Sequence, residues 1–313
     1  MIKKAAVIND LSGFGKCSLA ASIAILSVMG IQPCALPTAV LSNQTGYKNY
    51  YSYDFSMHMH NFADIWEKNQ VEFDGIYSGY VANASQIDFI SNFISRFKNP
   101  HTKVLIDPVM GDDGKRYAAY NDETCQKMCE LIKDADIITP NLTELCIIAN
   151  QDYDELANKS NDKNYLGIIA ELALKTAEKI SATVIVTGIK MQSDAVNHSC
   201  KHIDNSNNCL PEHFRTAPFT AKKEQYIYNG VFSNNDCYFA RSAQLGGSFS
   251  GTGDIFSSIV FASVINDVDI KTAVKYAAEF IEKAVADTIK SDYDRNDGIN
   301  FEKYLYTLAQ QGV

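Results

Sequence analysis

The sequence lacks three features that would each point to a particular class of protein. It has no excess of basic residues: 28 Lys and Arg against 37 Asp and Glu give a net charge of −9, which disfavours nucleic acid and anionic lipid surfaces as partners. No stretch reaches about 18 uninterrupted apolar residues. The apolar run after the N-terminal Met-Ile-Lys-Lys is too short for a secretory signal peptide. We therefore expect a cytoplasmic protein with no nucleic-acid partner and no membrane segment.

The sequence also lacks metal-binding cysteine spacing. Its eight cysteines form no CxxC pair and have no histidine at zinc-finger distance. Since a chain of 313 residues can bury a core without disulfides, we expect reduced cysteines packed in the core. They are Cys17, Cys34, Cys125, Cys129, Cys146, Cys200, Cys209 and Cys237.

What the chain does have is a regular alternation of short β-rich runs and amphipathic helical stretches. Continuous apolar strands separated by helices are typical of a parallel sheet covered on both faces. We predict an α/β fold with a three-layer, doubly wound, mostly parallel sheet. The expected strands are Ala5–Ile8, Pro33–Val40, Phe73–Gly79, Lys103–Pro108, Asp136–Thr139, Thr183–Thr187, Gln225–Asn229 and Asp236–Ser242. The expected helices are Ser18–Met29, Phe55–Lys68, Ala84–Phe97, Asp122–Lys133, one from Leu142, Tyr165–Ile180, Asp254–Ile265, Ile270–Ile289 and Asn300–Gln310.

One region breaks this rhythm. Residues 191–223 are polar and poor in periodic apolar positions, so we interpret them as a surface insertion. Cys200, His202, Cys209 and His213 lie in it, but their spacing matches no zinc pattern. There are no internal repeats and no linker, so residues 1–313 are expected to form a single domain.

In an open parallel sheet, ligands bind beyond the carboxyl ends of the strands. The most informative segment there is Leu245–Asp254, which reads LGGSFSGTGD and precedes a helix. Unpaired amide groups and the helix dipole at such a terminus bind anions. Asp254 is placed to take a proton from a hydroxyl group near a bound phosphate, although simple helix capping is an equally good interpretation of this residue alone.

Two further segments carry carboxylates after strands. Ile106–Gly114 reads IDPVMGDDG, with acidic residues beside a turn, as needed to handle Mg²⁺ through water. Ile138–Glu144 reads ITPNLTE and places Glu144 in the first turn of a helix. An acidic β-turn and a helix cap would explain these segments without any ligand.

The first strand ends in the segment Asn9–Ser18, NDLSGFGKCS. Like a P-loop, this segment lies between a strand and a helix, but its sequence does not match the P-loop consensus G-x-x-x-x-G-K-[ST]. Asp10 occupies the position of the first glycine of the consensus, and Cys17 occupies the position of its serine or threonine. Asp10 and Ser12 are better suited to hydrogen-bond a small polar substrate. The segment Ser42–Tyr47, SNQTGY, offers similar groups after the second strand, and turn formation alone would also account for both loops.

Taken together, four segments resemble the pyridoxal/pyridoxamine kinases of the ribokinase-like superfamily, over nearly the whole chain. The resemblance implies a ribokinase-like kinase that uses ATP and Mg²⁺, with a possible monovalent cation, to phosphorylate the hydroxymethyl group of pyridoxal, pyridoxamine or pyridoxine in vitamin B6 salvage. It also implies a homodimer. The segments are Ser42–Tyr47, Asp107–Gly111, Thr139–Glu144 and Gly251–Asp254.

The resemblance also implies roles for individual residues. Asp254 matches the catalytic base, and Gly251, Thr252 and Gly253 match the anion hole for the transferred phosphoryl group. The positions that match contacts to ATP and Mg²⁺ are Asp107, Asp112, Thr139, Asn141, Glu144 and Thr187, with Mg²⁺ held through water near Asp107 and Glu144. The positions expected to bind the substrate are Asp10, Ser12, Thr45, Gly46, Tyr80 and Asp254.

The N-terminal loop departs from this family. Asn9–Gly13 is similar to the D-x-S-G start of the hydroxymethylpyrimidine (phosphomethylpyrimidine) kinases of thiamine synthesis. Those enzymes usually carry a cysteine after G-T-G, where this chain has Asp254, so the pyridoxal substrates are favoured and the pyrimidine is the alternative. A nucleotide-binding homologue without turnover is a third hypothesis. A carboxylate beside an anion hole argues against it, because it would repel phosphate unless it had a proton to accept.

Overall fold

The fold is built on a nine-stranded sheet, seen in a computed structural model that describes residues 2–118, 120–191, 225–233, 236–291 and 294–309. The strand order is β11-β10-β9-β8-β5-β4-β1-β2-β3. Six adjacent strands, from β9 to β2, pair in parallel, whereas β3 and β10 run antiparallel to their neighbours. The strands are β1 (Lys3–Ser12), β2 (Ile31–Leu41), β3 (Ser52–Asp54), β4 (Gly75–Ser78), β5 (Lys103–Ile106), β8 (Ile137–Ile138), β9 (Thr183–Lys190), β10 (Tyr226–Ser233) and β11 (Asp236–Ala243), and a separate hairpin consists of β6 (Gly111–Asp112) and β7 (Lys115–Arg116).

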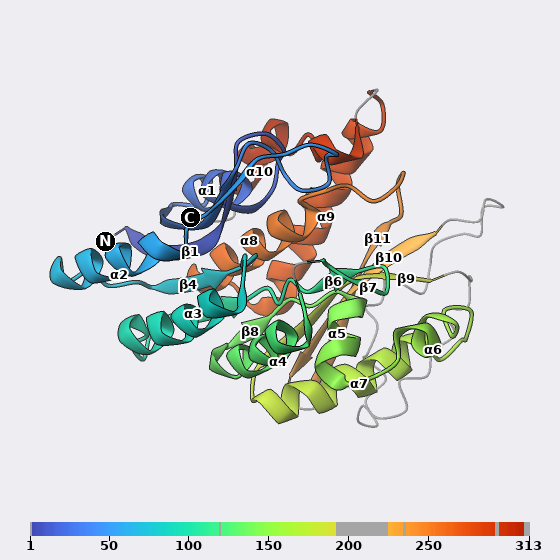
Figure 1. The fold of residues 1–313 in the computed structure, drawn as a ribbon. Coiled ribbons are helices and arrows are strands. Elements are labelled where there is room, and N and C mark those ends of the chain that lie inside the picture. The colour runs from blue at the N-terminus through green and yellow to red at the C-terminus, as the bar shows by residue number, and fades with distance from the viewer. Residues whose placement is uncertain (1, 119, 192–224, 234–235, 292–293, 310–313) are drawn as a thin grey trace.

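Helices cover both faces of the sheet, as Figure 1 shows. Alternate residues of β1 point to opposite faces: Ala6 and Ile8 pack in one apolar cluster with α2 to α7, and Ala5 and Val7 in another with α1, α8, α9 and α10. The two buried clusters are the reason that the strands read as continuous apolar runs. The helices are α1 (Ser18–Val28), α2 (Ser56–Lys68), α3 (Ala84–Phe97), α4 (Asp122–Leu131), α5 (Leu142–Ala149), α6 (Tyr153–Ala157), α7 (Tyr165–Ile180), α8 (Thr252–Ile265), α9 (Ile270–Thr288) and α10 (Leu305–Ala309).

The predicted three-layer α/β architecture is confirmed, with local differences. The helix predicted to start at Leu142, for which no end was predicted, ends at Ala149 because Asn150 adopts a left-handed conformation, with φ of 52°, that caps α5. The helix expected over Asn300–Gln310 is instead a 3-10 turn, Glu302–Tyr304, followed by α10. Strand β3 and the β6–β7 hairpin were not predicted.

The remaining expectations concern the insertion, the cysteines and the membrane. Met191, at the start of the predicted insertion, is buried, while residues 192–223 lie outside the described residues, as do the four His and Cys residues considered above for zinc. The six described cysteines carry free thiols and are buried or partly buried, as predicted. Among the helices that the structure describes, none combines the length and the apolar character needed to span a bilayer.

Candidate functional site

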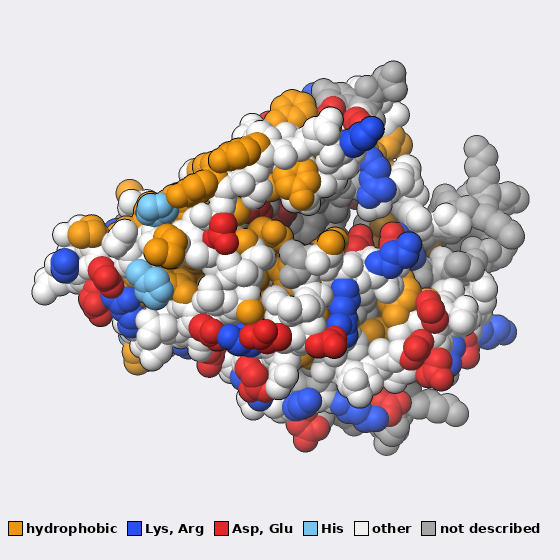
Figure 2. All heavy atoms as spheres, viewed as in Figure 1, with side chains coloured by type: hydrophobic (Ala, Val, Ile, Leu, Met, Phe, Trp, Pro, Cys, Tyr) orange, Lys and Arg blue, Asp and Glu red, His pale blue; other side chains and the backbone are white. Residues whose placement is uncertain are grey.

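Most of the predicted site residues gather where the parallel strands end. Ser12 ends β1, Tyr80 follows β4, Asp107 follows β5 and Thr139 follows β8. These strands are neighbours in the sheet, so their carboxyl ends share one edge. Helix α8, which carries Asp254, starts at the same edge, and Figure 2 shows the surface hollowed beside the β6–β7 hairpin.

Asp254 lies at the start of two helices at once. It is in the first turn of α8, and the backbone N–H of Ser18, the first residue of α1, faces its carboxylate and lowers its pKa. Burial, and to a smaller degree the carboxylate of Asp10, raise the pKa of Asp254 to about 6, although its hydrogen bonds oppose the shift. A carboxylate with a pKa near neutrality is suited to accept a proton from a bound hydroxyl group.

Gly251 brings the start of α8 against the loop before α1. Its φ is 80°, and a Cβ atom at this position would lie 2.1 Å from the carbonyl oxygen of Lys16, so only glycine fits. The first-turn N–H groups of Thr252 and Gly253 have no acceptor within their own helix. These N–H groups are the ones on which the predicted anion hole depends, and the anion hole itself stays a prediction.

The buried side chain of Asn9 connects Asp254 to the end of β1 and to the loop after β4. Its Nδ2 donates to Asp254 Oδ1 at 3.1 Å, and its Oδ1 accepts from the backbone N–H groups of Asp10 and Tyr80, each at 2.9 Å. Ser12 Oγ in turn donates to Asp10 Oδ2 at 2.8 Å. The structure thus joins four of the predicted site residues, and the sequence interpretation missed the residue that joins them.

A second buried network surrounds Asp107. Ser257, one turn after Asp254 on α8, donates from Oγ to Asp107 Oδ2 at 3.2 Å and lies 2.9 Å from Thr139 Oγ1. Burial, together with the charge of Asp254, raises the pKa of Asp107 to about 8. Ser257 was also missed; its position three residues after Asp254, on the same face of the helix, was the available signal.

Glu144 and Asn141 form a capping box at the start of α5. Asn141 Oδ1 accepts from the N–H of Glu144 at 3.0 Å, and Glu144 Oε2 accepts from the N–H of Asn141 at 2.8 Å. Glu144 Oε1 also accepts from the N–H of Met110 at 3.0 Å, and Asn141 Nδ2 donates to the carbonyl of Gly111 at 2.7 Å. The capping interpretation is therefore correct, and the same contacts fix the turn that follows Asp107.

The carboxylates of Asp107 and Glu144 suit a hydrated Mg²⁺ ion. They are 8% and 3% exposed. Burial first, and then the charge of Asp107, raise the pKa of Glu144 well above its usual value, so a divalent cation would offset an existing repulsion. Within the described ranges no group of three or more His, Cys, Asp or Glu side chains is gathered as for a metal ion. An ion here would keep water or phosphate oxygens as ligands, as Mg²⁺ prefers.

The loop after β2 contacts a different part of the molecule. Gln44 Oε1 accepts from the N–H of Gly46 at 2.6 Å, and Gln44 Nε2 donates to the carbonyl of Asn296 at 3.1 Å. Tyr47 donates its hydroxyl hydrogen to Asp297. Thr45 is exposed at the tip. The loop that carries Thr45 and Gly46 is therefore fixed by the segment before residue 298, and no recorded hydrogen bond joins these two residues to Asp254.

Two predicted nucleotide-binding residues lie at the edge of this group. Thr187, in β9, pairs with Asn141 as an isolated parallel bridge. Asp112, in β6, has an exposed surface, but neighbouring groups screen its carboxyl group partly from water; this desolvation and the charge of Asp113 raise its pKa, whereas the hydrogen bond from the N–H of Asp113 and the charges of Lys190 and Arg295 lower it. Both lie on segments adjacent to Gly111 and Asn141.

The contacts of Lys16 differ from those of a P-loop lysine, which binds phosphate. Its ammonium group donates to Asn300 Oδ1 at 3.1 Å and forms an ion pair with Glu302 at 2.9 Å. It ties the loop before α1 to the C-terminal segment. The structure therefore agrees with the prediction from the sequence that this segment is not a P-loop.

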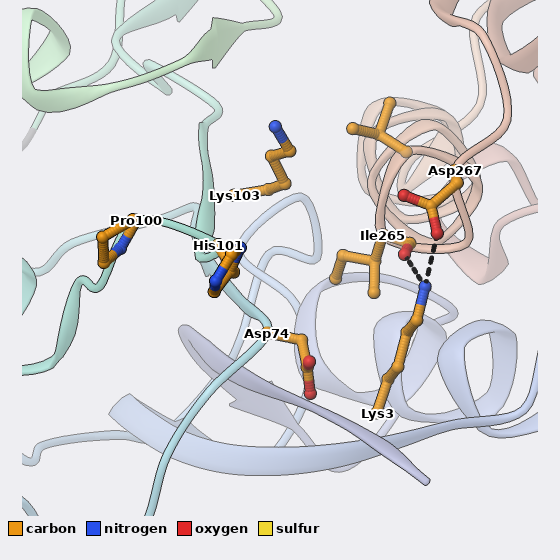
Figure 3. A pocket seen from close by; sticks show the side chains of 8 residues that line it. Lys3, Asp74, Pro100, His101, Lys103, Ile265 and Asp267 are labelled. Carbon is orange, nitrogen blue, oxygen red and sulfur yellow. Dashed lines mark hydrogen bonds and ion pairs between the residues drawn. The ribbon is translucent and has the colours of Figure 1, made fainter. Parts of the chain in front are cut away.

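A cavity of about 300 Å³ lies elsewhere, at the opposite end of α8 (Figure 3). In it Lys3 donates to the carbonyl of Ile265 and pairs with Asp267 at 3.0 Å. Because Asp254 is at the first turn of α8 and Ile265 is its last residue, this cavity is separate from the predicted site. Its lining residues are Lys3, Asp74, Pro100, His101, Lys103, Val264, Ile265 and Asp267.

Comparison with known proteins identifies the family. The family model described as phosphomethylpyrimidine kinase matches residues 17–298. This chain belongs to that family. Membership confirms the predicted ribokinase-like superfamily.

Solved structures with the same fold include members of both candidate groups. A Bacteroides thetaiotaomicron protein, provisionally named a phosphomethylpyrimidine kinase, is 32% identical, with a TM-score of 0.81 over 98% of this chain and 94% of that one. A second crystal form of that protein, with pyridoxal, has a TM-score of 0.79 over 98% of this chain and 96% of that one. Pyridoxal kinase from Lactobacillus plantarum, 21% identical, shares the fold with a TM-score of 0.78, over 99% of this chain and 98% of its own.

Named relatives match over shorter stretches. A Schizosaccharomyces pombe protein, provisionally named a pyridoxal kinase, is 27% identical over 75% of this chain and 59% of its own length. Pyridoxal kinase PdxY of Deinococcus radiodurans is 30% identical over 48% of this chain and 52% of its own length. This chain thus spans between about half and three-fifths of the length of these two relatives.

Proposed function

We propose that this protein transfers the γ-phosphoryl group of ATP to the hydroxymethyl group of pyridoxal, pyridoxamine or pyridoxine. The observation that carries the proposal is the position of Asp254, which follows Gly251–Gly253 in the first turn of α8 and is hydrogen-bonded through Asn9 to the end of β1 and to the loop after β4. The relative at 32% identity whose crystals contain pyridoxal supports this choice of substrate.

In this proposal Asp254 accepts the proton of the substrate hydroxyl group while the hydroxyl oxygen bonds to the γ-phosphorus and ADP leaves. The N–H groups of Gly251, Thr252 and Gly253 donate to the oxygens of the transferred group. Mg²⁺, held through water by Asp107 and Glu144, would neutralise charge on the phosphates. We propose that the remaining residues of the strand edge bind the two substrates: Asp10, Ser12, Thr45, Gly46 and Tyr80 the pyridine, and Asp112, Thr139, Asn141 and Thr187 the nucleotide.

The second candidate substrate is hydroxymethylpyrimidine. The hydrogen-bonded pair of Asp10 and Ser12, which comes from the D-x-S-G start, supports it, as does the description of the family. Both heterocycles offer a ring nitrogen and an exocyclic hydroxymethyl group, so the same base and anion hole would serve either.

The test is ADP formation in the presence of Mg²⁺ with pyridoxal, pyridoxamine, pyridoxine and hydroxymethylpyrimidine offered separately. We expect the highest kcat/KM with one of the three vitamers. A preference for the pyrimidine would reverse the assignment. No stimulation of ADP formation by any of the four would favour a nucleotide-binding homologue without turnover.

Three further expectations from the family accompany this proposal. We expect a homodimer, which light scattering of the purified protein would test. We expect one domain over residues 1–313, so that limited proteolysis yields no stable half. A dependence of the rate on K⁺ over Na⁺ at constant ionic strength would reveal a monovalent cation.

A further inference from the structure

We propose that Asn9 is a positioning residue that holds the base Asp254 at a fixed place relative to the end of β1 and the loop after β4, the two segments expected to receive the substrate. This inference rests on the proposed function, which makes Asp254 the base. Asn9 acts through Asp254 and through the backbone of Asp10 and Tyr80, and it is not itself a group that contacts the reacting atoms.

The hydrogen bonds of Asn9 join three segments that are far apart in the chain. Its acceptor atom faces the N–H of the adjacent Asp10 and that of Tyr80, 71 residues away, and its donor atom faces Asp254, 245 residues away. The side chain is fully buried. A buried amide whose polar atoms are all engaged has one orientation, because a flipped amide would place its N–H groups against two other N–H donors.

The surrounding chain leaves space for this amide. A Cβ atom on Gly79 would lie 2.4 Å from Asn9 Nδ2, so a side chain at residue 79 would displace it. Asparagine is the residue that offers an acceptor on one side and a donor on the other at this length. An aspartate at position 9 would keep the oxygen that accepts from Asp10 and Tyr80 but would lose the N–H that donates to Asp254. The Asn9→Asp variant therefore tests the contact with Asp254 separately from the other two.

Other ionisable groups also face Asp254 and influence the same titration. A substitution at Asn9 is therefore compared with wild type while all of these groups are left unchanged. They are Asp10 from β1, Cys17 before α1, Tyr77 from β4, Asp107 after β5 and Tyr117 after β7.

The decisive variant is Asn9→Asp. Its Oδ1 still accepts from Asp10 and Tyr80, whereas its second oxygen replaces the donor that faces Asp254. Two carboxylates at this distance disfavour ionisation of the base, so the acidic limb of the kcat profile should move up by at least about one pH unit. A shift of one unit from about 6 lowers the ionised fraction of the base at pH 7 from about nine-tenths to about one half, so we expect kcat at pH 7 to fall about twofold or more. The KM for the vitamer should change by less than about threefold, because the contacts of residue 9 with Asp10 and Tyr80 remain.

A matched control is Asn266→Asp at the other end of α8. Asn266 Nδ2 donates to the carbonyl of Met29 at 2.9 Å, so this variant also loses a donated amide hydrogen bond. We expect it to lower the melting temperature without moving the pH limb. A shift of the limb in this control as well would show that loss of stability alone produces the effect, and would overturn the proposal.

A second measurement does not depend on activity. In the double variant with Asn9→Asp and Asp254→Asn, the new amide of residue 254 donates back to the new carboxylate of residue 9. We expect the melting temperature lost in Asn9→Asp at pH 8 to be at least half recovered. Additive losses would show that the contact between residues 9 and 254 is unimportant.

The two measurements separate the two proposals. If wild type phosphorylates none of the offered substrates, the proposed function fails, and recovery in the double variant still tests the contact. If wild type is active and Asn9→Asp keeps both its kcat and its acidic limb, the positioning role of Asn9 fails while the proposed function stands.

Discussion

Replacing Asp107 by asparagine is expected to stabilise the metal-free protein at pH 8 more than at pH 5. Burial raises the pKa of Asp107 from 3.8 to about 8, so above about pH 4 the folded state keeps a proton that the unfolded state has released. The stability from this proton is fully present below about pH 4 and is lost as the pH rises towards 8. At about 1.4 kcal/mol per pH unit, wild type loses up to about 4 kcal/mol from this group between pH 5 and pH 8.

The assay is urea unfolding in EDTA at the two pH values. The Asp107→Asn substitution removes the charge and keeps an oxygen that accepts from Ser257 Oγ. The difference in unfolding free energy between variant and wild type therefore reports the titration of Asp107 together with its effect on Glu144. The control is Asp88→Asn, which removes an exposed carboxylate paired with Lys127 and should change stability by less than about 1 kcal/mol at either pH. Added Mg²⁺ should stabilise wild type more than Asp107→Asn. An unchanged pH dependence in Asp107→Asn would refute the reasoning.

Two further variants test the loops around the site. Gly251→Ala should cost more than about 2 kcal/mol, since it meets both a φ of 80° and the carbonyl of Lys16 at 2.1 Å, whereas Gly247→Ala, with nothing within 4 Å, should be nearly neutral in thermal unfolding. Equal effects of the two would contradict the close approach of the loops. Asn141→Ala removes the cap of α5 and the bond to Gly111, and should cost about 1–2 kcal/mol and raise the KM for ATP. A loss of stability with an unchanged KM would limit Asn141 to capping.

Most of the fold was predictable because its strands are buried on both faces. The run Ala5–Ile8 is apolar at every position, which indicates a strand covered by helices on both sides, and the structure divides these residues between the two apolar clusters. Strand β3 was not predictable in this way. Ser52, Tyr53 and Asp54 are all exposed at the outer edge, so no burial pattern marks them.

The site was predictable only where a local sequence motif is by itself typical of a binding function. The carboxylates after β5 and at the start of α5 follow a general rule for parallel sheets, and the helix start at Gly251–Asp254 is an anion-binding pattern. Asn9 and Ser257 have no such pattern. Their roles depend on partners more than 100 residues away in the chain, at Asp254, Asp107 and Thr139, so only the assembled sheet edge reveals them.

The most direct test of the account is the pH dependence of kcat/KM for the vitamers with wild type and Asp254→Asn. Because burial raises the pKa of Asp254 to about 6, the wild-type rate should fall as the pH decreases through about 6, where the base becomes protonated. Asp254→Asn should lower kcat by about 10²–10⁴-fold while still binding ATP. A variant that keeps the full rate and the same acidic limb would contradict the assignment of Asp254 as the base.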